Sequence, residues 1–244
     1  MSSPTAIVLI TGANKGIGLA IAGLLAKEHD GYHILLGSRD SERGRKAAES
    51  LQREGLSVEA LTVDVTDEDS IAAAVRTVKF KFGRLDVLIN NAGVALDIGK
   101  DIVTTRSMFD ETFAVNFFGP AAVTEAFIPL LEQSTAARIV FVTSDLASLT
   151  MRADPQGRDN HVAAPAYRSS KSALNMLALG YAHRFRDRGW KVNMDNPGFT
   201  PTDMTGGRGT RTLEEGARNA VRLATLGEDG PTGTYSEREG LLPW

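Results

Sequence analysis

The sequence predicts a doubly wound α/β fold in one domain over residues 1–244, with a mostly parallel sheet and helices on both faces. Three observations predict it. A short apolar run, a glycine-rich turn and apolar residues at helical spacing follow one another within Ala6–Leu25. Similar strand and helix patterns alternate along the rest of the chain. Hydrophobic residues make up 42% of the sequence without a shift midway, which is typical of one soluble domain with a sizeable core.

Charge and residue usage exclude several functional classes. The net charge is -3 and the charges are interspersed, so no basic face indicates nucleic acid or an anionic membrane. The sequence has no cysteine, and its four histidines are not paired at helical spacing. The first ten residues lack the pattern of a secretory signal, and we expect no apolar run to reach the length of a membrane span. We therefore expect a soluble, cytoplasmic protein with no metal, no nucleic-acid partner and no membrane partner.

The glycine-rich turn, Thr11–Gly18, has the sequence TGANKGIG. Gly12 would let the chain leave the strand in a tight turn, while Gly16 and Gly18 would let the backbone and the helix approach a pyrophosphate closely. The free N–H groups and the positive dipole end of the helix would face the phosphates. The spacing differs from the usual Gly-x-Gly-x-x-Gly, so the turn by itself is also compatible with a plain strand–helix connection.

The second strand, predicted over His33–Gly37, ends at the position that selects between two cofactors. An acidic residue there would bind ribose hydroxyls and favour NAD, but this sequence has Ser38 followed by Arg39. A guanidinium binds a 2′-phosphate in bidentate fashion, and Lys15 adds a second positive charge. The alternative is that both cations are solvated surface residues. The sequence favours NADP.

Alternating elements follow, and local signals mark their ends. A helix over Ser41–Glu54 has Ser41 as its expected N-cap and Gly55 beyond its end. The next predicted elements are a strand over Val58–Val63, a helix over Asp67–Phe82 that ends at Gly83, and a strand over Leu85–Ile89.

Polar residues follow the third and fourth strands. Asp64 either accepts a hydrogen bond from an adenine amino group or only shapes the turn, and both interpretations stay open. Asn90-Asn91-Ala92-Gly93 follows the fourth strand. Because ligands of doubly wound sheets lie at the carboxyl ends of the strands, we expect Asn91–Gly93 beside the glycine turn.

The second half of the chain continues the alternation. A long helical region, Thr105–Leu131, contains Asn116, which costs helix propensity and is also compatible with a local kink. A buried strand over Arg138–Thr143 ends at Ser144. The polar stretch 149–165 is predicted to be a loop, either a lid over the site or a tolerated insertion.

Two groups suited to proton transfer begin the next helix. Tyr167 and Lys171 are four residues apart and therefore share one helix face. The pKa of a tyrosine side chain is ordinarily about 10, and a nearby positive charge such as that of Lys171 would lower it. Such a pair also occurs by chance in many helices, so its meaning depends on the other motifs.

Taken together, the motifs resemble the short-chain dehydrogenase/reductase family. The matching pieces are TGANKGIG, Asp64-Val65, NNAG at Asn90–Gly93, Asn116, Ser144, YRSSK at Tyr167–Lys171 and NPG at Asn196–Gly198. They occur in the family's order along essentially the whole chain. Within the family the sequence is similar to carbonyl reductases, through GIGLAI, LDVLINNAG, VNFFG, PGFTPTDM and the segment that includes GPTGTYSEREGLLPW.

The resemblance implies a role for each reacting group. Tyr167 would protonate the carbonyl oxygen as hydride arrives, and Ser144 would orient that oxygen. Lys171 would bind the nicotinamide ribose, and Asn116 would anchor a water that links Lys171 to solvent. The implied cofactor-binding residues are Gly12, Asn14, Lys15, Gly16, Ile17, Gly18, Ser38, Arg39, Asp64, Val65, Asn91, Ala92, Gly93, Tyr167 and Lys171, with Pro197, Gly198, Thr200 and Thr202 over the nicotinamide.

The sequence departs from the family on the substrate side. Asp145 places a carboxylate where a neutral residue is more usual. The interval from Ser144 to Tyr167 is longer than in compact members and shorter than the insertion of monomeric animal carbonyl reductases. Phe199 and Met204 are interpreted as lining an apolar pocket or belonging to the core. Arg152 and His161, in the polar loop, are candidates for substrate contact.

We therefore predict that NADPH reduces a ketone or aldehyde to an alcohol in a Rossmann-type domain. The alternatives are NADP-dependent oxidation of a secondary alcohol and a non-catalytic NADP sensor; a nucleotide-sugar epimerase would need a longer C-terminal substrate region. The expected partners are a small carbonyl substrate and further copies of the chain. Helices at Pro120–Leu131 and Tyr167–Phe185 form dimer or tetramer faces in many family members.

Overall fold

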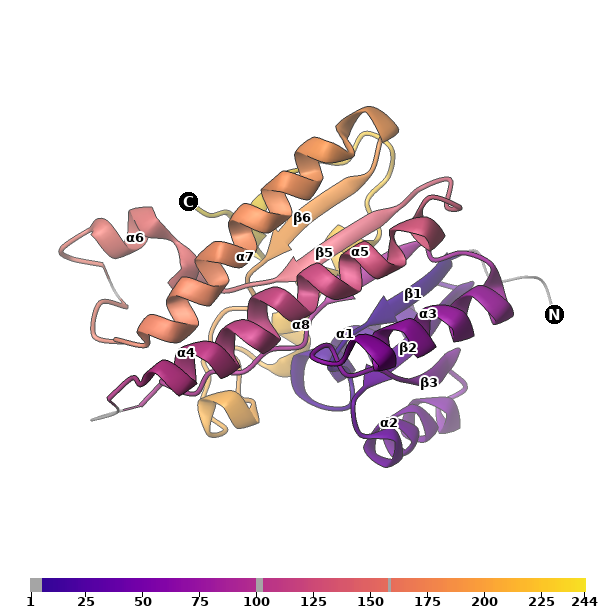
Figure 1. The fold of residues 1–244 in the computed structure, drawn as a ribbon, viewed down its shortest axis with the longest axis horizontal. Coiled ribbons are helices and arrows are strands. Elements are labelled where there is room, and N and C mark those ends of the chain that lie inside the picture. Colours follow the sequence, from indigo (N-terminus) through magenta and orange to yellow (C-terminus); the bar gives the residue numbers. More distant parts are fainter. Residues whose placement is uncertain (1–5, 100–102, 158) are drawn as a thin grey trace.

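The computed structural model describes residues 6–99, 103–157 and 159–244. One eight-stranded sheet runs through it in the order β3-β2-β1-β4-β5-β6-β7-β8 (Figure 1). Its strands are β1 (Ala6–Ile10), β2 (Tyr32–Ser38), β3 (Val58–Thr62), β4 (Val87–Asn90), β5 (Arg138–Val142), β6 (Lys191–Asp195), β7 (Tyr235–Glu237) and β8 (Gly240–Leu241). Every neighbouring pair is parallel except β7 and β8. The predicted doubly wound α/β fold is confirmed.

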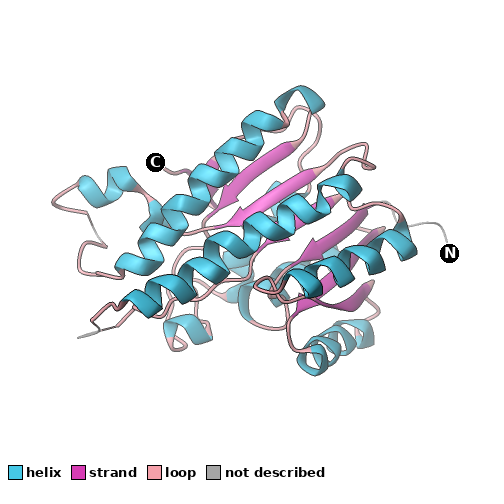
Figure 2. Ribbon diagram, in the orientation of Figure 1, coloured by secondary structure: helices cyan, strands magenta, loops and turns pink. Residues whose placement is uncertain are grey.

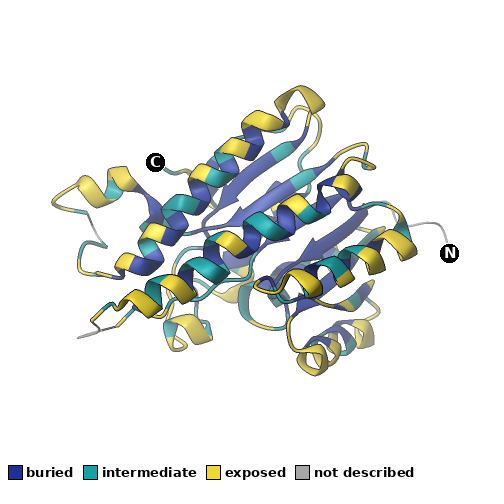
Figure 3. Cartoon of the chain, in the orientation of Figure 1, coloured by how far each residue is buried: buried dark blue, intermediate teal, exposed yellow. Residues whose placement is uncertain are grey.

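Helices cover both faces of this sheet (Figure 2). The helices are α1 (Gly16–Glu28), α2 (Ser41–Arg53), α3 (Glu68–Phe82), α4 (Arg106–Phe113), α5 (Gly119–Leu131), α6 (Leu149–Ala153), α7 (Pro165–Arg184) and α8 (Leu213–Ala224). Apolar side chains of α3, α5 and α7 form one core layer, and those of α1, α2 and α8 form the other. The central strands are buried between the two layers (Figure 3), as apolar runs without alternation predict.

Local capping signals set most helix ends, with one correction. Asp40, not Ser41, caps α2: its carboxylate accepts a hydrogen bond from the backbone N–H of Arg43 at 3.0 Å. Asp67 caps α3 as predicted, and Gly83 ends that helix in the left-handed conformation at φ 71°. The bounds of the other predicted elements differ from the observed ones by one or two residues.

The long helical region Arg106–Leu131 runs through α4, a π-helical turn and α5. Its 26 residues contain an 18-residue window with a mean hydropathy of 1.4, so by length and composition alone the helix could cross a membrane, which our expectation about apolar runs did not allow for. Half of its most apolar window is buried in the protein. Val123 and Phe127 of α5 belong to the core layer beside α3 and α7, so in this fold the segment is a core helix.

Asp195, the last residue of β6, is a buried carboxyl that makes stability depend on pH. One oxygen accepts a hydrogen bond from Asn219 Nδ2 at 2.7 Å, and the other is buried without a hydrogen-bond partner among the described residues. Burial raises the pKa of Asp195 from 3.8 to about 7, although the hydrogen bond from Asn219 and the charge of Arg222 oppose it. The folded state therefore binds this proton more tightly than the unfolded chain does.

We expect Asp195→Asn to remove a pH dependence of stability. Because the folded-state pKa of Asp195 is the higher one, its contribution is lost as pH rises between about 4 and 7, at about 1.4 kcal/mol per pH unit. The variant should lack this slope and be more stable than the wild type above pH 7. Urea unfolding at pH 5 and pH 8 measures the free energy of unfolding of both proteins. If this free energy changes equally between the two pH values in the wild type and the variant, the expectation is contradicted.

Candidate active site

The glycine turn and the segment after β4 meet at the carboxyl edge of the sheet. Asn91 Nδ2 donates to the backbone oxygens of Thr11 at 2.8 Å and Gly12 at 3.1 Å. The backbone N–H groups of Asn91 and Ala92 both donate to Thr11 Oγ1, at 3.0 and 3.1 Å. Four hydrogen bonds therefore hold Asn91–Gly93 beside the glycine turn, where the sequence places it.

The turn leaves room for a phosphate group at the start of α1. Gly12 has φ +62°, and a Cβ atom on Gly18 would lie 2.5 Å from Asn91 Nδ2, so neither position accepts a side chain without strain. Lys15, the N-cap of α1, is extended, and no side chain caps the helix and no acidic residue lies in its first turn. The backbone N–H groups of the first turn of α1 are therefore not capped by a side chain. These N–H groups, together with glycines that have no Cβ atom, fit a dinucleotide pyrophosphate. The remaining predicted residues of the turn, Asn14, Gly16 and Ile17, are half-buried.

The two predicted cofactor cations have different surroundings. Lys15 is exposed and pairs with the carboxylate of Asp203, in the short helical turn Asp203–Thr205. Arg39 is exposed directly after β2. Ser38 is buried, and its hydroxyl donates to the backbone oxygen of Asp40 at 2.7 Å. The structure therefore places Arg39 in solvent and gives Lys15 a protein partner.

Ser144 and Tyr167 come together at the carboxyl end of β5. Burial raises the pKa of Tyr167 to about 12; the neighbouring Ser144 hydroxyl lowers it, and the charge of Asp145 raises it. Ser144 Oγ also donates to Asp145 Oδ1 at 3.2 Å and accepts from the backbone N–H of Leu146 at 3.2 Å. A buried phenol beside a second hydroxyl can donate a proton to a bound oxygen atom.

Lys171 lies near this pair, one helical turn after Tyr167 on α7. Its Nζ donates to the backbone oxygen of Val142 at 2.8 Å and lies 6.0 Å from the centroid of the Tyr167 ring. The lowering of the Tyr167 pKa by the charge of Lys171 stays a prediction. Burial lowers the pKa of Lys171 to about 8. A Cβ atom on Gly93 would lie 3.4 Å from Nζ, so Lys171 borders the cofactor side.

Asn116 lies at the centre of the π-helical turn Ala114–Phe118 and is fully buried. Its side chain accepts from the N–H of Val94 and donates to the oxygen of the same residue, both at 2.8 Å. Its Nδ2 also donates to Ser170 Oγ at 3.0 Å, and Ser170 Oγ donates to the backbone oxygen of Tyr167 at 2.7 Å. The helix irregularity thus turns an amide toward the segment after β4 and toward α7.

Two residues that the sequence analysis missed form hydrogen bonds to the main chain at Tyr167 and Ser144. Asp97, after β4, accepts from the backbone N–H groups of Ala166 at 2.6 Å and Tyr167 at 3.2 Å. Tyr235, in β7, donates its hydroxyl to the backbone oxygen of Ser144 at 2.5 Å. Both are almost completely buried. Each therefore fixes the main chain that carries one of the two hydroxyls.

Asp64 and Val65 follow β3. Asp64 Oδ1 accepts from the N–H of Thr66 at 2.9 Å and from its hydroxyl at 2.7 Å, so Asp64 shapes the turn, and its contact with adenine stays a prediction. Val65 is buried against α5, because a Cβ atom on Gly119 would lie 2.8 Å from Val65 Cγ2. Of the two, only Val65 has a packing role in the core.

The segment 197–202 lies against the start of α1. A Cβ atom on Gly16 would be 3.5 Å from Thr202 Cγ2. The hydroxyl of Thr200 is buried and donates to the backbone oxygens of Gly198 at 3.1 Å and Pro197 at 3.3 Å. This brings the four predicted residues of the segment to the edge of the sheet that also holds the glycine turn.

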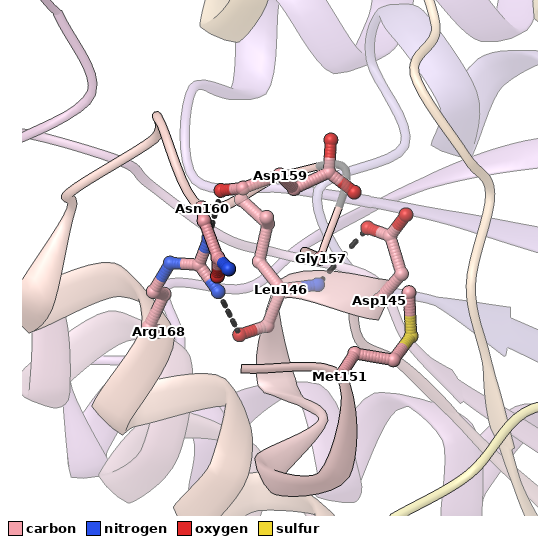
Figure 4. A pocket seen from close by; sticks show the side chains of 7 residues that line it. All are labelled: Asp145, Leu146, Met151, Gly157, Asp159, Asn160 and Arg168. Carbon is pink, nitrogen blue, oxygen red and sulfur yellow. Dashed lines mark hydrogen bonds between the residues drawn. The ribbon is translucent and has the colours of Figure 1, made fainter. Parts of the chain in front are cut away.

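The substrate-side stretch 149–165 contains a short helix and is not a plain loop. It begins with α6, whose N-cap Ser148 accepts from the N–H of Met151 at 3.0 Å. Arg168, one residue after Tyr167, donates to the backbone oxygens of Leu146, Asp159 and Val162 at 3.2, 2.6 and 3.0 Å. Figure 4 shows Arg168 and Asp159 around a small cavity that Asp145 also lines. The Arg168 guanidinium therefore attaches the stretch to α7 through Asp159 and Val162, and bonds the segment after β5 through Leu146.

Four substrate-side candidates remain: Phe199, Met204, Arg152 and His161. Phe199 is 50% exposed and Met204 is 38% exposed, so neither belongs to the core. Arg152 Nη1 donates to the backbone oxygen of Asn160 at 3.1 Å, within the stretch itself. Substrate contact by Arg152 and His161 stays a prediction.

Comparison with known proteins agrees with this geometry. A profile described as short chain dehydrogenase matches residues 6–212. A short-chain dehydrogenase/reductase of Stachybotrys chlorohalonatus is 38% identical over 98% of this chain and 94% of its own. A mouse carbonyl reductase that is named for NADPH is 31% identical over the whole of both chains.

Solved structures have the same architecture. The NADPH-bound carbonyl reductase from chicken fatty liver superposes with a TM-score of 0.85 at 27% identity and covers all of both chains. Salutaridine reductase from Papaver somniferum gives a TM-score of 0.82 at 28% identity, over 93% of this chain and 98% of that one. The sequence match, the fold and the position of the site at the edge of the sheet all agree with one family. The chain belongs to the short-chain dehydrogenase family of oxidoreductases.

Proposed function

We propose that this protein reduces a ketone or aldehyde to an alcohol, with NADPH as hydride donor and Tyr167 as proton donor. The observation that supports this most is that the Ser144 hydroxyl neighbours the buried Tyr167 phenol, at the sheet edge that also holds the glycine turn. The names of the mouse and chicken relatives, both NADPH carbonyl reductases, support the same cofactor and chemistry.

The reaction needs a hydride, a proton and a fixed substrate oxygen. NADPH, when bound, would supply the hydride for the carbonyl carbon. Tyr167 gives its phenolic proton to the carbonyl oxygen, so the substrate gains two electrons and two hydrogens in total. Ser144 donates a hydrogen bond to the same oxygen and holds it within reach of the phenol. Lys171, cationic below its pKa of about 8, binds the nicotinamide ribose hydroxyls.

Burial keeps Tyr167 in the protonated form that a proton donor needs, because it raises the pKa of the phenol to about 12. The reverse reaction, oxidation of a secondary alcohol, would use the same groups, and the activity test below separates the two directions.

Cofactor choice rests on Lys15 and Arg39. Asp40, the residue after Arg39, accepts from the N–H of Arg43 at 3.0 Å and lies 3.2 Å from Arg43 Nε, so its carboxylate already has partners. Asp203 is the carboxylate that pairs with Lys15. We expect Arg39→Ala and Lys15→Ala each to raise the KM for NADPH by about tenfold, since each loses a charge-assisted contact with the 2′-phosphate. The KM for NADH should stay within twofold of the wild type. Steady-state kinetics with both cofactors measures this, and equal effects on both would mean that the cations are ordinary surface residues.

The proposed activity is tested by following NADPH oxidation with a panel of ketones, aldehydes and quinones. Turnover that prefers NADPH over NADH is the expected result. NADPH binding without turnover of any panel member would instead support a cofactor sensor, and faster oxidation of secondary alcohols at neutral pH would support the reverse reaction.

We also propose that the protein forms a homo-oligomer through α5 and α7. An apolar groove lies between the two helices, and Phe117, Met176 and Leu177 are among the residues that line it. Met176 is 70% exposed in the isolated chain. The resemblance to family members that assemble through these helices supports the same use here, and sedimentation equilibrium of the purified protein measures the mass in solution.

A further inference from the structure

The helix that carries the reacting tyrosine cannot cap its own first turn. Its N-cap residue is Ala164, which is buried and has φ +41°, a left-handed conformation that residues other than glycine rarely adopt. An alanine has no side-chain acceptor, and the next residue, Pro165, has no N–H. The first amides of α7 that need an acceptor are therefore those of Ala166 and Tyr167.

Asp97 supplies both acceptors from a distant part of the chain. Its Oδ2 accepts from the N–H of Ala166 at 2.6 Å and its Oδ1 from the N–H of Tyr167 at 3.2 Å, over 69 and 70 residues of sequence. Thr104 Oγ1 donates to Oδ2 at 3.3 Å. Asp97 is only 3% exposed, so water does not compete for these bonds. A carboxylate on the positive end of a twenty-residue helix is a strong, directional contact.

The position of Asp97 connects the two halves of the site. It follows β4 by seven residues, directly beyond the Asn91–Gly93 segment that is bonded to the glycine turn. Asn116 holds the same segment through Val94 and reaches α7 through Ser170. The cofactor edge and the start of α7 are thus joined at two points, and Asp97 is the one that bonds the backbone of the tyrosine itself.

We propose that Asp97 is the positioning residue for Tyr167: its carboxylate caps α7 from across the site and fixes the phenol opposite Ser144 and the cofactor cleft. The proposal rests on the function proposed above, since it assigns the placement of that reaction's proton donor. A displacement of about 1 Å at a reacting group costs on the order of a hundredfold in rate.

The test compares Asp97→Ala and Asp97→Asn with a matched control, Asp67→Ala. Asp67 also caps a helix through two backbone amides, those of Asp69 at 2.9 Å and Ser70 at 3.3 Å, but on α3. We expect Asp97→Ala to lower kcat by about thirtyfold or more while the KM for NADPH stays within twofold. Asp97→Asn keeps one acceptor in the same volume and should recover part of the loss. Asp67→Ala should keep the wild-type kcat at a temperature where all the proteins are folded.

Amide hydrogen exchange separates this proposal from the proposed function. The amides of Ala166 and Tyr167 should exchange faster in both Asp97 variants, and their exchange rates in Asp67→Ala should equal those of the wild type. This measurement needs no known substrate. A wild-type protein that reduces no carbonyl with NADPH overturns the proposed function, and the exchange rates then still test the cap. Unchanged exchange in the Asp97 variants, or an equal loss of kcat in Asp97→Ala and Asp67→Ala, overturns the role of Asp97. If Asp97→Ala does not fold, Asp97→Asn decides the question by the same two measurements.

Discussion

The Tyr167→Phe variant is expected to reduce carbonyl substrates about a thousandfold more slowly than the wild type, because general acid catalysis by a positioned side chain contributes roughly this much. Tyr167 is buried and its ring packs in the same space as phenylalanine, so the change removes one hydroxyl and little else. The KM for NADPH should change by less than threefold. Steady-state kinetics and a cofactor-binding titration measure the two effects separately.

A matched control for this variant is Tyr32→Phe. Tyr32 begins β2, at the amino edge of the sheet and away from the site, and its ring contacts His29 at 5.4 Å between centroids. The same loss of a hydroxyl there should leave kcat unchanged. A Tyr167→Phe enzyme with more than a tenth of the wild-type kcat would show that the proton comes from another group.

The Gly18→Ala variant is expected to lose cofactor binding almost completely. The added Cβ atom would lie 2.5 Å from Asn91 Nδ2, 2.8 Å from the Gly12 oxygen and 2.9 Å from the Ala13 Cα atom. Two of these neighbours are main-chain atoms of the turn, so the turn itself has to move and the phosphate site is displaced. Overpacking of this kind costs about 1–3 kcal/mol of stability. Fluorescence titration with NADPH and thermal unfolding measure both losses.

Gly23→Ala, on the same helix, is the control for the glycine change. A Cβ atom at this position would lie 3.4 Å from the end of the Leu51 side chain, which has room to adjust. Alanine also has the higher helix propensity, so this variant should bind NADPH normally and be slightly more stable. Equal NADPH affinity of the two variants would mean that the turn does not hold the phosphates.

Signals that act over a few residues allowed most of the fold to be predicted. Apolar strands buried on both faces, an aspartate before α3 and Gly83 after it all depend on their immediate neighbours. The error at the start of α2 has the same origin, since Asp40 and Ser41 are adjacent and both are good N-caps. The π-helical turn at Ala114–Phe118 depends on contacts of Asn116 with distant segments, so helix propensity indicated only an irregularity there.

Site residues that belong to a sequence motif could be predicted. Residues that reach the site only through long-range tertiary contacts could not. The hydroxyls of Ser144 and Tyr167 come together as the motifs suggest, but burial, the largest influence on the pKa of the tyrosine, depends on the whole fold and not on the motif. Asp97 and Tyr235 bond main-chain atoms 70 and 91 residues away, and such pairings leave no periodic pattern in a sequence. One signal for Asp97 was present: Ala164-Pro165 begins a helix without any capping side chain, so an acceptor from elsewhere was required.

The way Arg168 attaches the substrate-side stretch bears on how the substrate range of this enzyme can evolve. Its guanidinium bonds three main-chain oxygens, those of Leu146, Asp159 and Val162, and none of these bonds depends on a side chain of the stretch. Every amino acid provides the same carbonyl oxygen. Most side chains of the stretch can therefore be exchanged for others while its attachment next to the tyrosine is inherited unchanged, whereas Arg152 and Asn160 also bond main-chain oxygens within the stretch and help to set its path.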